Sequence, residues 1–380
     1  MARSRIRRRG WALVGVLLGA AMSAVVLHKQ LARAYQATLA LAELGGLHVP
    51  AWLDNRAAVR RDTLGFTVAG TSVRADCYRP EGRPRAALVL VHGAAGGGKD
   101  DPRLVEFANA LARARLLVMV PDVPGLRQWQ LRPDEALPLS ATLRYLRDHR
   151  DLNPGGRLGL GAFSVGIGPA VLAASEVPVD FMLDVGGYYD LPRTLDYLTT
   201  GRYSAGGASL DREPNAYGKW VAAGSYAGQL PSAHDREVLG AIARLKLEAP
   251  SAAVADLARS LGPQGRAVYA YITNTDPARA AERRSELPER VLQDIRRLNL
   301  ARHDLGALQA RWVIVHGRDD TIIPYQESEA LAAALAAGQG PGWGRLFLLR
   351  GLAHVERKPG ALDGWVLWRA LYALLAAAEG

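Results

Sequence analysis

The pattern of apolar and polar positions changes near residue 64. Segments 65–68 and 72–78 alternate polar and apolar residues, as expected of a half-exposed antiparallel hairpin. After them come continuous apolar runs, which are typical of strands covered on both faces. These runs are 86–91, 116–120, 157–161, 180–185, 312–315 and 346–349.

Helical patterns lie between the first four of these runs. Segments 102–115, 134–150 and 165–175 space their apolar residues with a period close to that of an α-helix. A strand that is followed by a helix and another strand returns in the same direction through a right-handed crossover. We therefore predict an α/β fold with a mostly parallel, doubly wound sheet.

One connection is much longer than a single crossover requires. About 120 residues separate Gly186 from Leu308. The stretch opens with a Gly- and Tyr-rich segment, predicted as a loop, and continues with helical patterns at 236–247, 251–261 and 287–298. An insertion of this size between two core strands is most simply a helical cap over the ends of the sheet, where it shapes substrate access.

An uncharged run of 17 residues, 11–27, follows an arginine cluster at the N-terminus. As a helix it is about 25 Å long, near the lower limit for crossing a bilayer. The arginines before the run outnumber Lys29 and Arg33 after it, so the body of the protein is expected to be translocated, to the periplasm in a bacterium. A secreted form after signal cleavage and a buried or interfacial helix are the alternatives.

The chain is thus expected to have five parts. Helical apolar spacing continues after the anchor and indicates a stalk or a docking helix. The parts are a membrane anchor at 1–30, a helical stalk or linker at 31–63, a first core part at 64–190, a helical cap at 191–308 and a second core part at 309–380.

Charge does not point to a nucleic-acid partner. The net charge is +10, but the seven basic residues up to Arg33 precede the first acidic residue, Glu43, and the remaining 347 residues carry only +3. The sequence has no zinc-finger spacing and no basic stripe interleaved with aromatic residues. The single cysteine, Cys77, excludes an intramolecular disulfide and a Cys-rich zinc site.

Candidate chemistry begins with a serine that directly follows a predicted buried strand. In Gly161-Ala162-Phe163-Ser164-Val165-Gly166 a strand passes through a tight turn into a helical pattern. Such an elbow strains the serine backbone and needs small residues two positions away on either side, which Ala162 and Gly166 provide, although the usual motif has glycine first. A serine hydroxyl also needs a base, an orienting acid and an oxyanion hole.

Three further blocks, each just after a predicted strand, could supply these groups. His92-Gly93-Ala94 opens a Gly-rich turn whose backbone N–H groups can face an oxyanion together with the N–H of Val165. The segment 316–324 (HGRDDTIIP) offers a carboxylate, and Gly351-Leu352-Ala353-His354 offers an imidazole. The chain order Ser, Asp, His matches that of α/β-hydrolase triads.

Together the four blocks resemble the α/β-hydrolase superfamily, above all its dienelactone-hydrolase and prolyl-oligopeptidase-like branches, over about residues 64–378. The resemblance implies a serine hydrolase without cofactor or metal. In it Ser164 attacks the carbonyl carbon, His354 transfers the proton, and Asp320 orients the imidazole. Ala94 and Val165 are the expected oxyanion donors. Further candidates are Asp319, Asp184 or Asp190 as the acid, whereas His92 and His316 are expected to be structural.

The same glycine turn also fits a nucleotide-binding loop. Residues 93–99 read GAAGGGK after a buried strand, which matches the GxxxxGK pattern. Asp100 and Asp101 then stand where a Ser or Thr would bind magnesium, and two carboxylates would repel phosphates. Pro102 also starts the helix later than phosphate binding at a helix N-terminus requires. The pattern therefore argues against a nucleotide site.

The functional prediction is a membrane-anchored serine hydrolase acting on a small ester or a related carbonyl compound. A peptidase or acyltransferase of the same fold is an alternative, as is a non-catalytic interaction protein. Four tyrosines early in the insertion are either a wall of the substrate pocket or packing between cap and core. They are Tyr188, Tyr189, Tyr197 and Tyr203.

Overall fold

The computed structural model describes residues 26–47, 49–205, 208–353, 356–357 and 361–380. Its centre is an eight-stranded sheet with the order β1-β2-β4-β3-β5-β6-β9-β10. Only the pairings β1·β2 and β2·β4 are antiparallel, which confirms the mostly parallel sheet. The strands are β1 (Val59–Val68), β2 (Thr71–Pro80), β3 (Ala86–Val91), β4 (Leu116–Pro121), β5 (Leu158–Phe163), β6 (Phe181–Val185), β9 (Arg311–Gly317) and β10 (Gly344–Leu349).

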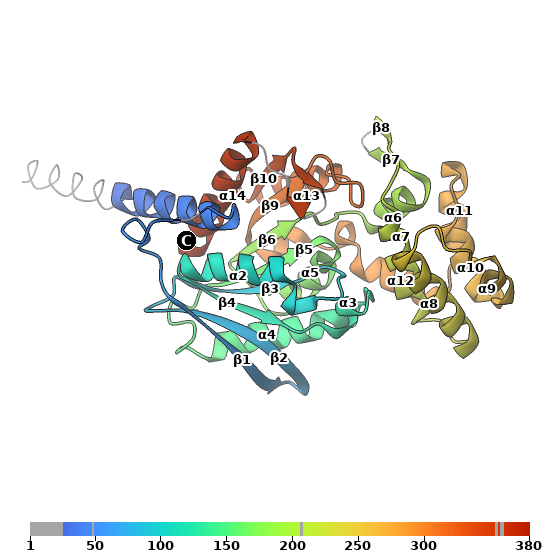
Figure 1. The fold of residues 1–380 in the computed structure, drawn as a ribbon, viewed down its shortest axis with the longest axis horizontal. Helices are drawn as coiled ribbons and strands as arrows, with labels where there is room; N and C mark the ends of the chain where they lie inside the picture. Colours follow the sequence, from blue (N-terminus) through green and yellow to red (C-terminus); the bar gives the residue numbers. More distant parts are fainter. Residues whose placement is uncertain (1–25, 48, 206–207, 354–355, 358–360) are drawn as a thin grey trace, which may run out of the picture.

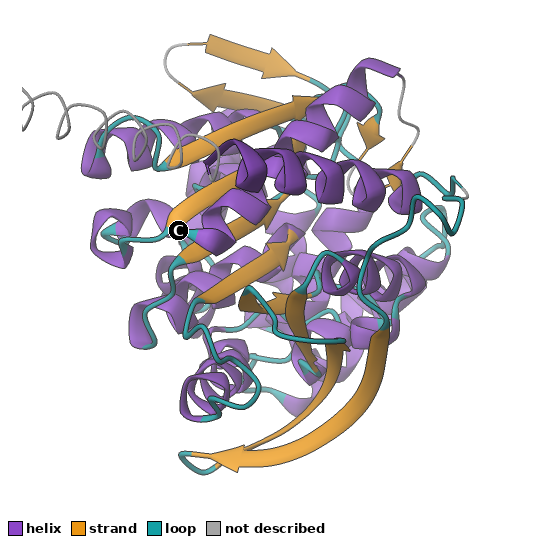
Figure 2. Ribbon diagram, turned by 90° about the vertical axis from the view of Figure 1, so that its left-hand side faces the viewer, coloured by secondary structure: helices purple, strands orange, loops and turns teal. Residues whose placement is uncertain are grey.

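The predicted hairpin forms one edge of this sheet. β1 begins at Val59, earlier than the alternating pattern from Gly65 indicated, and pairs with β2 over its whole length. Figure 2 shows the two long strands curving away from the rest of the sheet. The inner strands β3 and β4 are buried at every position because helices cover both of their faces.

Two helix layers sandwich the sheet (Figures 1 and 2). One face carries α2 (Pro102–Arg113) and α14 (Ala361–Glu379), which share a hydrophobic cluster with Leu183 and Val185 of β6. The opposite face carries α4 (Ala136–Asp148), α5 (Ile167–Glu176) and α13 (Gln326–Gln339), which share a second cluster with Met182. Successive residues of β6 thus point to opposite layers.

The long connection between β6 and β9 lies at the right of Figure 1, beyond one end of the sheet. It is called the insert below. It is mainly helical. The predicted boundaries of the cap, 191–308, stay a prediction. Its elements are α6 (Leu191–Thr200), β7 (Arg202–Ala205), β8 (Ala208–Asp211), α7 (Ala216–Ala227), α8 (Ala233–Glu248), α9 (Ala255–Ser260), α10 (Pro263–Ile272), α11 (Ala280–Ser285) and α12 (Glu289–Leu298).

The prediction that the insert opens with a loop is wrong. Residues 191–200 form α6, and β7 pairs with β8 as a hairpin. The Asp190 side chain accepts a hydrogen bond from the Arg193 N–H and so caps the first turn, and Gly201 ends the helix with φ +76°. Both are common helix-end signals, which the many glycine and tyrosine residues of the segment obscured.

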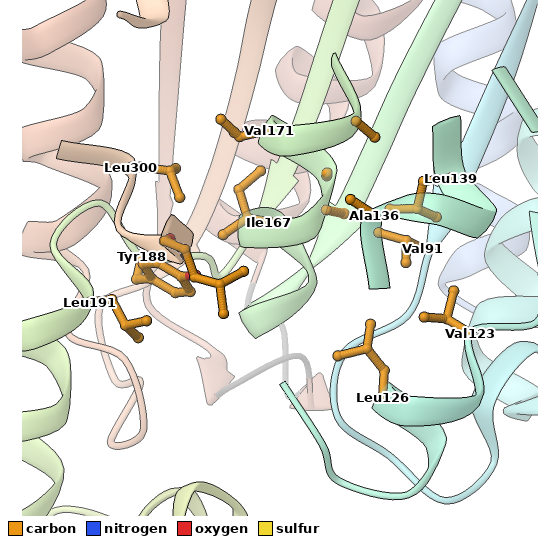
Figure 3. Packing of buried hydrophobic residues seen from close by; sticks show 14 of the residues in the cluster. Val91, Val123, Leu126, Ala136, Leu139, Ile167, Val171, Tyr188, Leu191 and Leu300 are labelled. Carbon is orange, nitrogen blue, oxygen red and sulfur yellow. Dashed lines mark hydrogen bonds between the residues drawn. The ribbon is translucent and has the colours of Figure 1, made fainter. Parts of the chain in front are cut away.

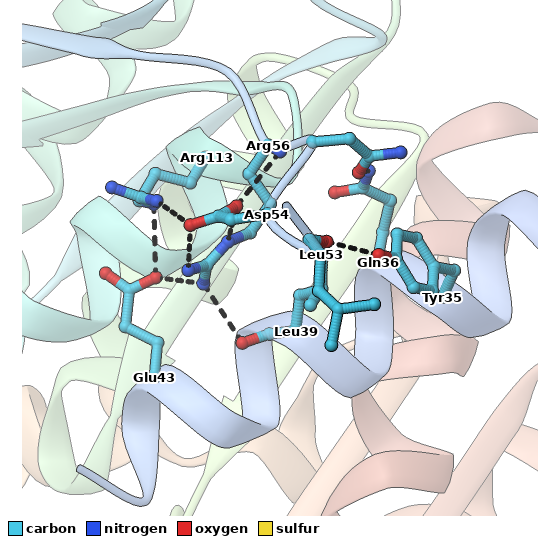
Figure 4. A network of polar contacts seen from close by, with 9 residues as sticks. Tyr35, Gln36, Leu39, Glu43, Leu53, Asp54, Arg56 and Arg113 are labelled. Carbon is cyan, nitrogen blue, oxygen red and sulfur yellow. Dashed lines mark hydrogen bonds and ion pairs between the residues drawn. The ribbon is translucent and has the colours of Figure 1, made fainter. Parts of the chain in front are cut away.

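Residues 26–44 form a helix that lies against α14 (Figure 1). The Trp368 indole N–H of α14 donates to Thr38 Oγ1 over 2.9 Å, and Arg33 is paired with Glu379. On the other side, Arg56 joins this helix to the chain that follows it (Figure 4): its guanidinium donates to the Leu39 carbonyl over 3.0 Å. The helix is therefore fixed to the core.

Among the described residues, no helix has both the length and the apolar character to cross a membrane. The predicted anchor run, 11–27, lies outside the described residues except for its last two positions. Val26 and Leu27 at those positions are exposed apolar side chains.

Candidate active site

Ser164 occupies a sharp turn between β5 and α5. Its φ is +53°, a left-handed conformation that costs a non-glycine residue of order 1 kcal/mol or more. A Cβ on Gly166 would lie 2.7 Å from the His92 carbonyl oxygen, so this position requires glycine. Ala162, where the usual motif has glycine, is fully buried and packs in the α4–α5 cluster. The departure from the motif therefore leaves the elbow intact.

Packing around the elbow holds this strained turn. Ile167 and Val171 of α5 lie in the same buried cluster as Val91 of β3 (Figure 3). Because β3 is the neighbour of β5 in the sheet, the nucleophile and the loop that follows β3 are positioned by one rigid block. Preorganisation of this kind is what an active site needs.

The loop after β3 passes directly beside Ser164. A Cβ on Gly93 would lie 3.1 Å from the Ser164 Cβ, so only glycine permits this approach. The next residue, Ala94, borders Ser164 in two cavities, and Val165 lines the smaller of them, which measures about 60 Å³. The residues predicted as oxyanion donors are therefore neighbours of the predicted nucleophile.

The insert fixes this loop from outside. The Tyr217 hydroxyl of α7 donates to the Ala94 carbonyl oxygen over 3.0 Å, and the Trp129 indole N–H donates to the same hydroxyl over 2.9 Å. Sequence reasoning missed both residues, because the first lies 123 positions away from Ala94. The insert thus holds the peptide between Ala94 and Ala95, directly after the predicted donor, and the Gly93 carbonyl of the preceding peptide, which carries the Ala94 N–H, lies 2.7 Å from His92 Nδ1.

The two adjacent aspartates after β9 differ sharply in their surroundings. Asp320 is 1% exposed, and its Oδ1 accepts hydrogen bonds from the backbone N–H groups of Ile322 and Ile323 over 2.8 and 3.0 Å. Asp319 is exposed. A Cβ on Gly186, just after β6, would lie 3.8 Å from Asp320 Oδ2, so this carboxylate sits at the same sheet edge as the elbow. The geometry favours Asp320 as the orienting acid.

His354 lies outside the described residues. The chain just before it forms β11 (Leu352–Ala353), which contacts β9. β9 leads into the loop that carries Asp320. The role of His354 stays a prediction.

Two buried groups lie below Asp320 on the α4–α5 side of the sheet. His316 Nε2 is 3.4 Å from Asp320 Oδ2 and donates to the Ile323 carbonyl over 2.9 Å. Its Nδ1 shares a 2.7 Å hydrogen bond with Ser328. Burial raises the pKa of Asp184 to about 7, although the charge of His316 partly opposes the shift. Both ring nitrogens of His316 thus have buried protein partners, and Asp184 is fully buried at the strand position that pairs with Ala162.

The nucleotide-loop pattern serves a different purpose here. The Lys99 ammonium lies 3.0 Å from Asp76 Oδ2 of β2 and 2.9 Å from Asp100 Oδ1. Asp76 is buried, and its ion pairs with Lys99 and Arg61 hold the pKa of its carboxyl below the usual value. The ammonium that a phosphate would need is therefore neutralised by protein carboxylates.

The tyrosines early in the insert pack against the core. Tyr188 donates to the Leu298 carbonyl over 2.9 Å, and Tyr203 donates to Glu327 Oε1 over 2.7 Å. Tyr197 is fully buried. None of these three, nor Tyr189, is among the described residues that line the two cavities beside Ser164, which favours the packing interpretation.

Ser164 opens into a second, much larger cavity of about 740 Å³. This volume is typical of small-molecule binding sites. Polar side chains line it near the nucleophile, among them Asp101, Asn215, Tyr217 and Thr321. Ser164 is itself only 7% exposed, and it lines this cavity together with the loop that can donate backbone N–H groups and with Thr321, the residue after the buried Asp320.

Comparison of the sequence with protein-family models and with curated proteins finds no match. The structure is similar to an esterase of Pyrococcus furiosus, at 15% identity and a TM-score of 0.47 over 85% of this chain and 92% of that chain. It is also similar to dienelactone hydrolase from Anabaena variabilis, at 14% identity and a TM-score of 0.44 over 83% of this chain and 98% of that one.

A puromycin-hydrolysing peptidase of Mycobacterium tuberculosis is similar at 16% identity and a TM-score of 0.46. The match covers 87% of this chain but only 40% of the peptidase, so the chain spans about two fifths of that protein. Similarities at this level of sequence identity say nothing about activity or substrate. The mostly parallel sheet and the strained strand-to-helix turn at Ser164 fit the α/β-hydrolase fold that the sequence motifs imply.

Proposed function

We propose that the protein is a serine hydrolase that cleaves an ester or a related carbonyl compound through an acyl-enzyme. The observation that carries the proposal is that Ser164 is held at φ +53° by close packing and lines a large cavity. A strained, preorganised serine of this kind is costly for stability and is found mainly at functional sites.

The reaction has two halves. Ser164 Oγ attacks the carbonyl carbon while its proton passes to His354, whose imidazolium Asp320 orients and stabilises. The oxyanion accepts hydrogen bonds from the N–H groups of Ala94 and Val165. The intermediate then expels the alcohol, which takes the proton from His354. Water attacks the acyl-enzyme by the same route, which releases the acid and restores the serine.

A fluorophosphonate probe tests the nucleophile directly, because it phosphonylates only activated serines. We expect labelling of the wild-type protein and none of Ser164→Ala. Ser175→Ala, a change at the other end of α5, is the matched control and should label like wild type. Absence of labelling in folded wild-type protein would contradict the proposal and favour a non-catalytic role.

We also propose that the run 11–27 anchors the protein, with the catalytic part translocated. In support, Val26, Leu27 and Leu31 are 48%, 56% and 61% exposed, so the described start of the helix presents apolar side chains that the core leaves uncovered. N-terminal sequencing of the membrane fraction tests this. Recovery of the intact N-terminus in that fraction supports the anchor, and a mature protein that starts after the run indicates a cleaved signal.

A further inference from the structure

The large cavity does not end at the nucleophile but continues along one face of the sheet. Its floor is formed by Phe163 of β5, Leu183 and Val185 of β6, and Val313 and Val315 of β9. Val185 is the last residue of β6 and Leu183 lies two residues before it, so the cavity extends about 7 Å along the strand from the carboxyl edge of the sheet. These side chains belong to the face that α2 and α14 cover.

The walls come from helices at both ends of the chain. α14 lines the cavity from Leu367 to Leu374, about 10 Å along the helix axis. Leu104 and Phe107 of α2 form the facing wall, and Leu41 and Leu44 come from the helix 26–44. We call this part, lined by β6, β9, α2, α14 and the helix 26–44, the apolar channel.

Polarity is distributed unevenly along the cavity. Besides Ser164, the polar lining residues belong to loops or to the first or last turn of helices: they are His92, Asp101, Arg103, Asn215, Tyr217, Lys246 and Thr321. The side chains quoted above for the channel are all aliphatic or aromatic. Such a channel binds water poorly, since water needs two or more polar partners, and an unfilled apolar space destabilises the fold. Its natural occupant is a hydrocarbon.

We propose that the substrate is an ester that carries a long unbranched hydrocarbon chain, and that this chain lies in the apolar channel while the ester group faces Ser164. The proposal rests on the serine-hydrolase function and specifies its substrate class. An apolar space that extends between a sheet and three helices can take up a hydrocarbon chain, and burial of its methylene groups supplies binding free energy in proportion to the length buried.

The helix 26–44 thereby becomes part of the substrate site. Its position is fixed by polar contacts on both sides of the channel: Thr38 bonds to Trp368 of α14, and Glu43 pairs with Arg113 of α2. Leu41 and Leu44 lie on the same segment of this helix and face the channel. The segment that precedes the core thus closes the channel instead of serving only as a connector.

Chain-length profiles test the channel. With p-nitrophenyl butyrate, octanoate and laurate, kcat/KM of the wild type should rise by up to about fourfold for each methylene buried. Ala370→Phe adds a ring to a buried residue that lines the channel, and we expect it to reduce the laurate-to-butyrate ratio of kcat/KM at least about tenfold. Ala376→Phe, on the same helix but away from the cavity lining, should keep the wild-type ratio and is the control.

A binding measurement keeps this test independent of turnover. Laurate and butyrate are titrated calorimetrically into Ser164→Ala, with and without Ala370→Phe. We expect laurate to bind at least about tenfold more tightly than butyrate, and the second change to remove that difference. Equal affinities, or a preference that Ala370→Phe leaves intact, would overturn the channel proposal even if fluorophosphonate labels Ser164. Laurate binding without labelling would instead overturn the hydrolase and leave a lipid-binding site.

Which side of the ester enters the channel is decided by a matched pair of substrates. Ethyl laurate carries the long chain on the acyl side, and dodecyl acetate carries it on the alcohol side. Sensitivity of only one of them to Ala370→Phe assigns the side, and insensitivity of both contradicts the proposal.

Discussion

At the scale of single residues, Asp319 and Asp320 show how burial separates two identical side chains. Asp320 is enclosed and accepts two backbone hydrogen bonds, whereas its neighbour faces solvent. An enclosed carboxylate with fixed lone pairs can hold an imidazole in one tautomer, and an exposed one cannot. The surroundings of Ala94 are likewise set by a distant residue, because its carbonyl accepts a hydrogen bond from the hydroxyl of Tyr217, 123 positions away.

Asp320→Asn is expected to lower kcat by about 10³–10⁴-fold, because the amide no longer orients and stabilises the protonated base. Asp319→Asn should change kcat by less than about threefold. Steady-state kinetics with a soluble ester measure both, and thermal unfolding confirms that each variant is folded. A large loss in the Asp319 variant alone would transfer the acid role to that residue.

Tyr217→Phe tests the contact between the insert and the oxyanion loop. The change keeps the ring but removes the hydroxyl that bonds to the Ala94 carbonyl. We expect kcat to fall about tenfold with KM changed less than about threefold, since the loop loses a contact one peptide after the predicted donor, and displacement of this loop weakens transition-state stabilisation rather than substrate binding. Tyr269→Phe, also in the insert but away from the cavity lining, should leave both constants unchanged. Equal changes in kcat and KM would indicate a role in binding instead.

At the scale of elements, the helix 26–44 is held by a partly buried ionic network (Figure 4). The Arg56 side chain is 4% exposed and makes two 2.8 Å hydrogen bonds to Asp54, and it also pairs with Glu43. These contacts hold the pKa of the Asp54 carboxyl well below its usual value. Removal of one partner from such a network leaves uncompensated charges in a poorly solvated place.

Arg56→Met should therefore lower the free energy of unfolding by about 2–3 kcal/mol. Arg60→Met removes a guanidinium that is 70% exposed and pairs with Asp62, and it should cost no more than about 0.5 kcal/mol. Urea unfolding at neutral pH compares the two. Equal effects would mean that the network does not fix the helix.

At the scale of the whole molecule, Asp184 and His316 place titratable groups inside the central sheet. The pKa of Asp184 is raised to about 7, mainly by burial. The pKa of His316 is also raised, because the charges of Asp320 and Asp184 outweigh its own burial. A raised pKa means that the folded state binds protons more tightly than the unfolded state, so the free energy of unfolding falls as the pH rises.

We expect this fall between about pH 4, where an unfolded aspartate titrates, and about pH 7. Asp184→Asn should reduce this pH dependence. The change in free energy of unfolding that the substitution causes should be more favourable at pH 8 than at pH 5 by at least about 1 kcal/mol. Urea unfolding across pH 5–8 measures the slope, and Asp319→Asn is the exposed control. An unchanged slope in Asp184→Asn would show that this carboxyl is already ionised throughout.

Much of the core could be predicted from the sequence, because strand and helix patterns are local. The run 86–91 became β3, and 116–120 became most of β4, since uninterrupted apolar residues are stable only where both faces are covered. The elbow could be predicted for the same reason, because the strained turn at Ser164 requires small residues at fixed positions close to it in the sequence. The prediction for segment 191–200 was wrong, because the glycines and tyrosines that flank it outweighed its helix caps.

What the sequence determined by itself is therefore the α/β core, the elbow serine, and an ordered set of candidate partners after successive strands. Only the tertiary structure decided that Asp320 is enclosed while Asp319 is not, and that Tyr217 holds Ala94. It also brought Leu41 and Leu374, from opposite ends of the chain, to one cavity beside Ser164. Burial and cavities arise from contacts between distant segments, and no local pattern of residues encodes which distant segments will meet.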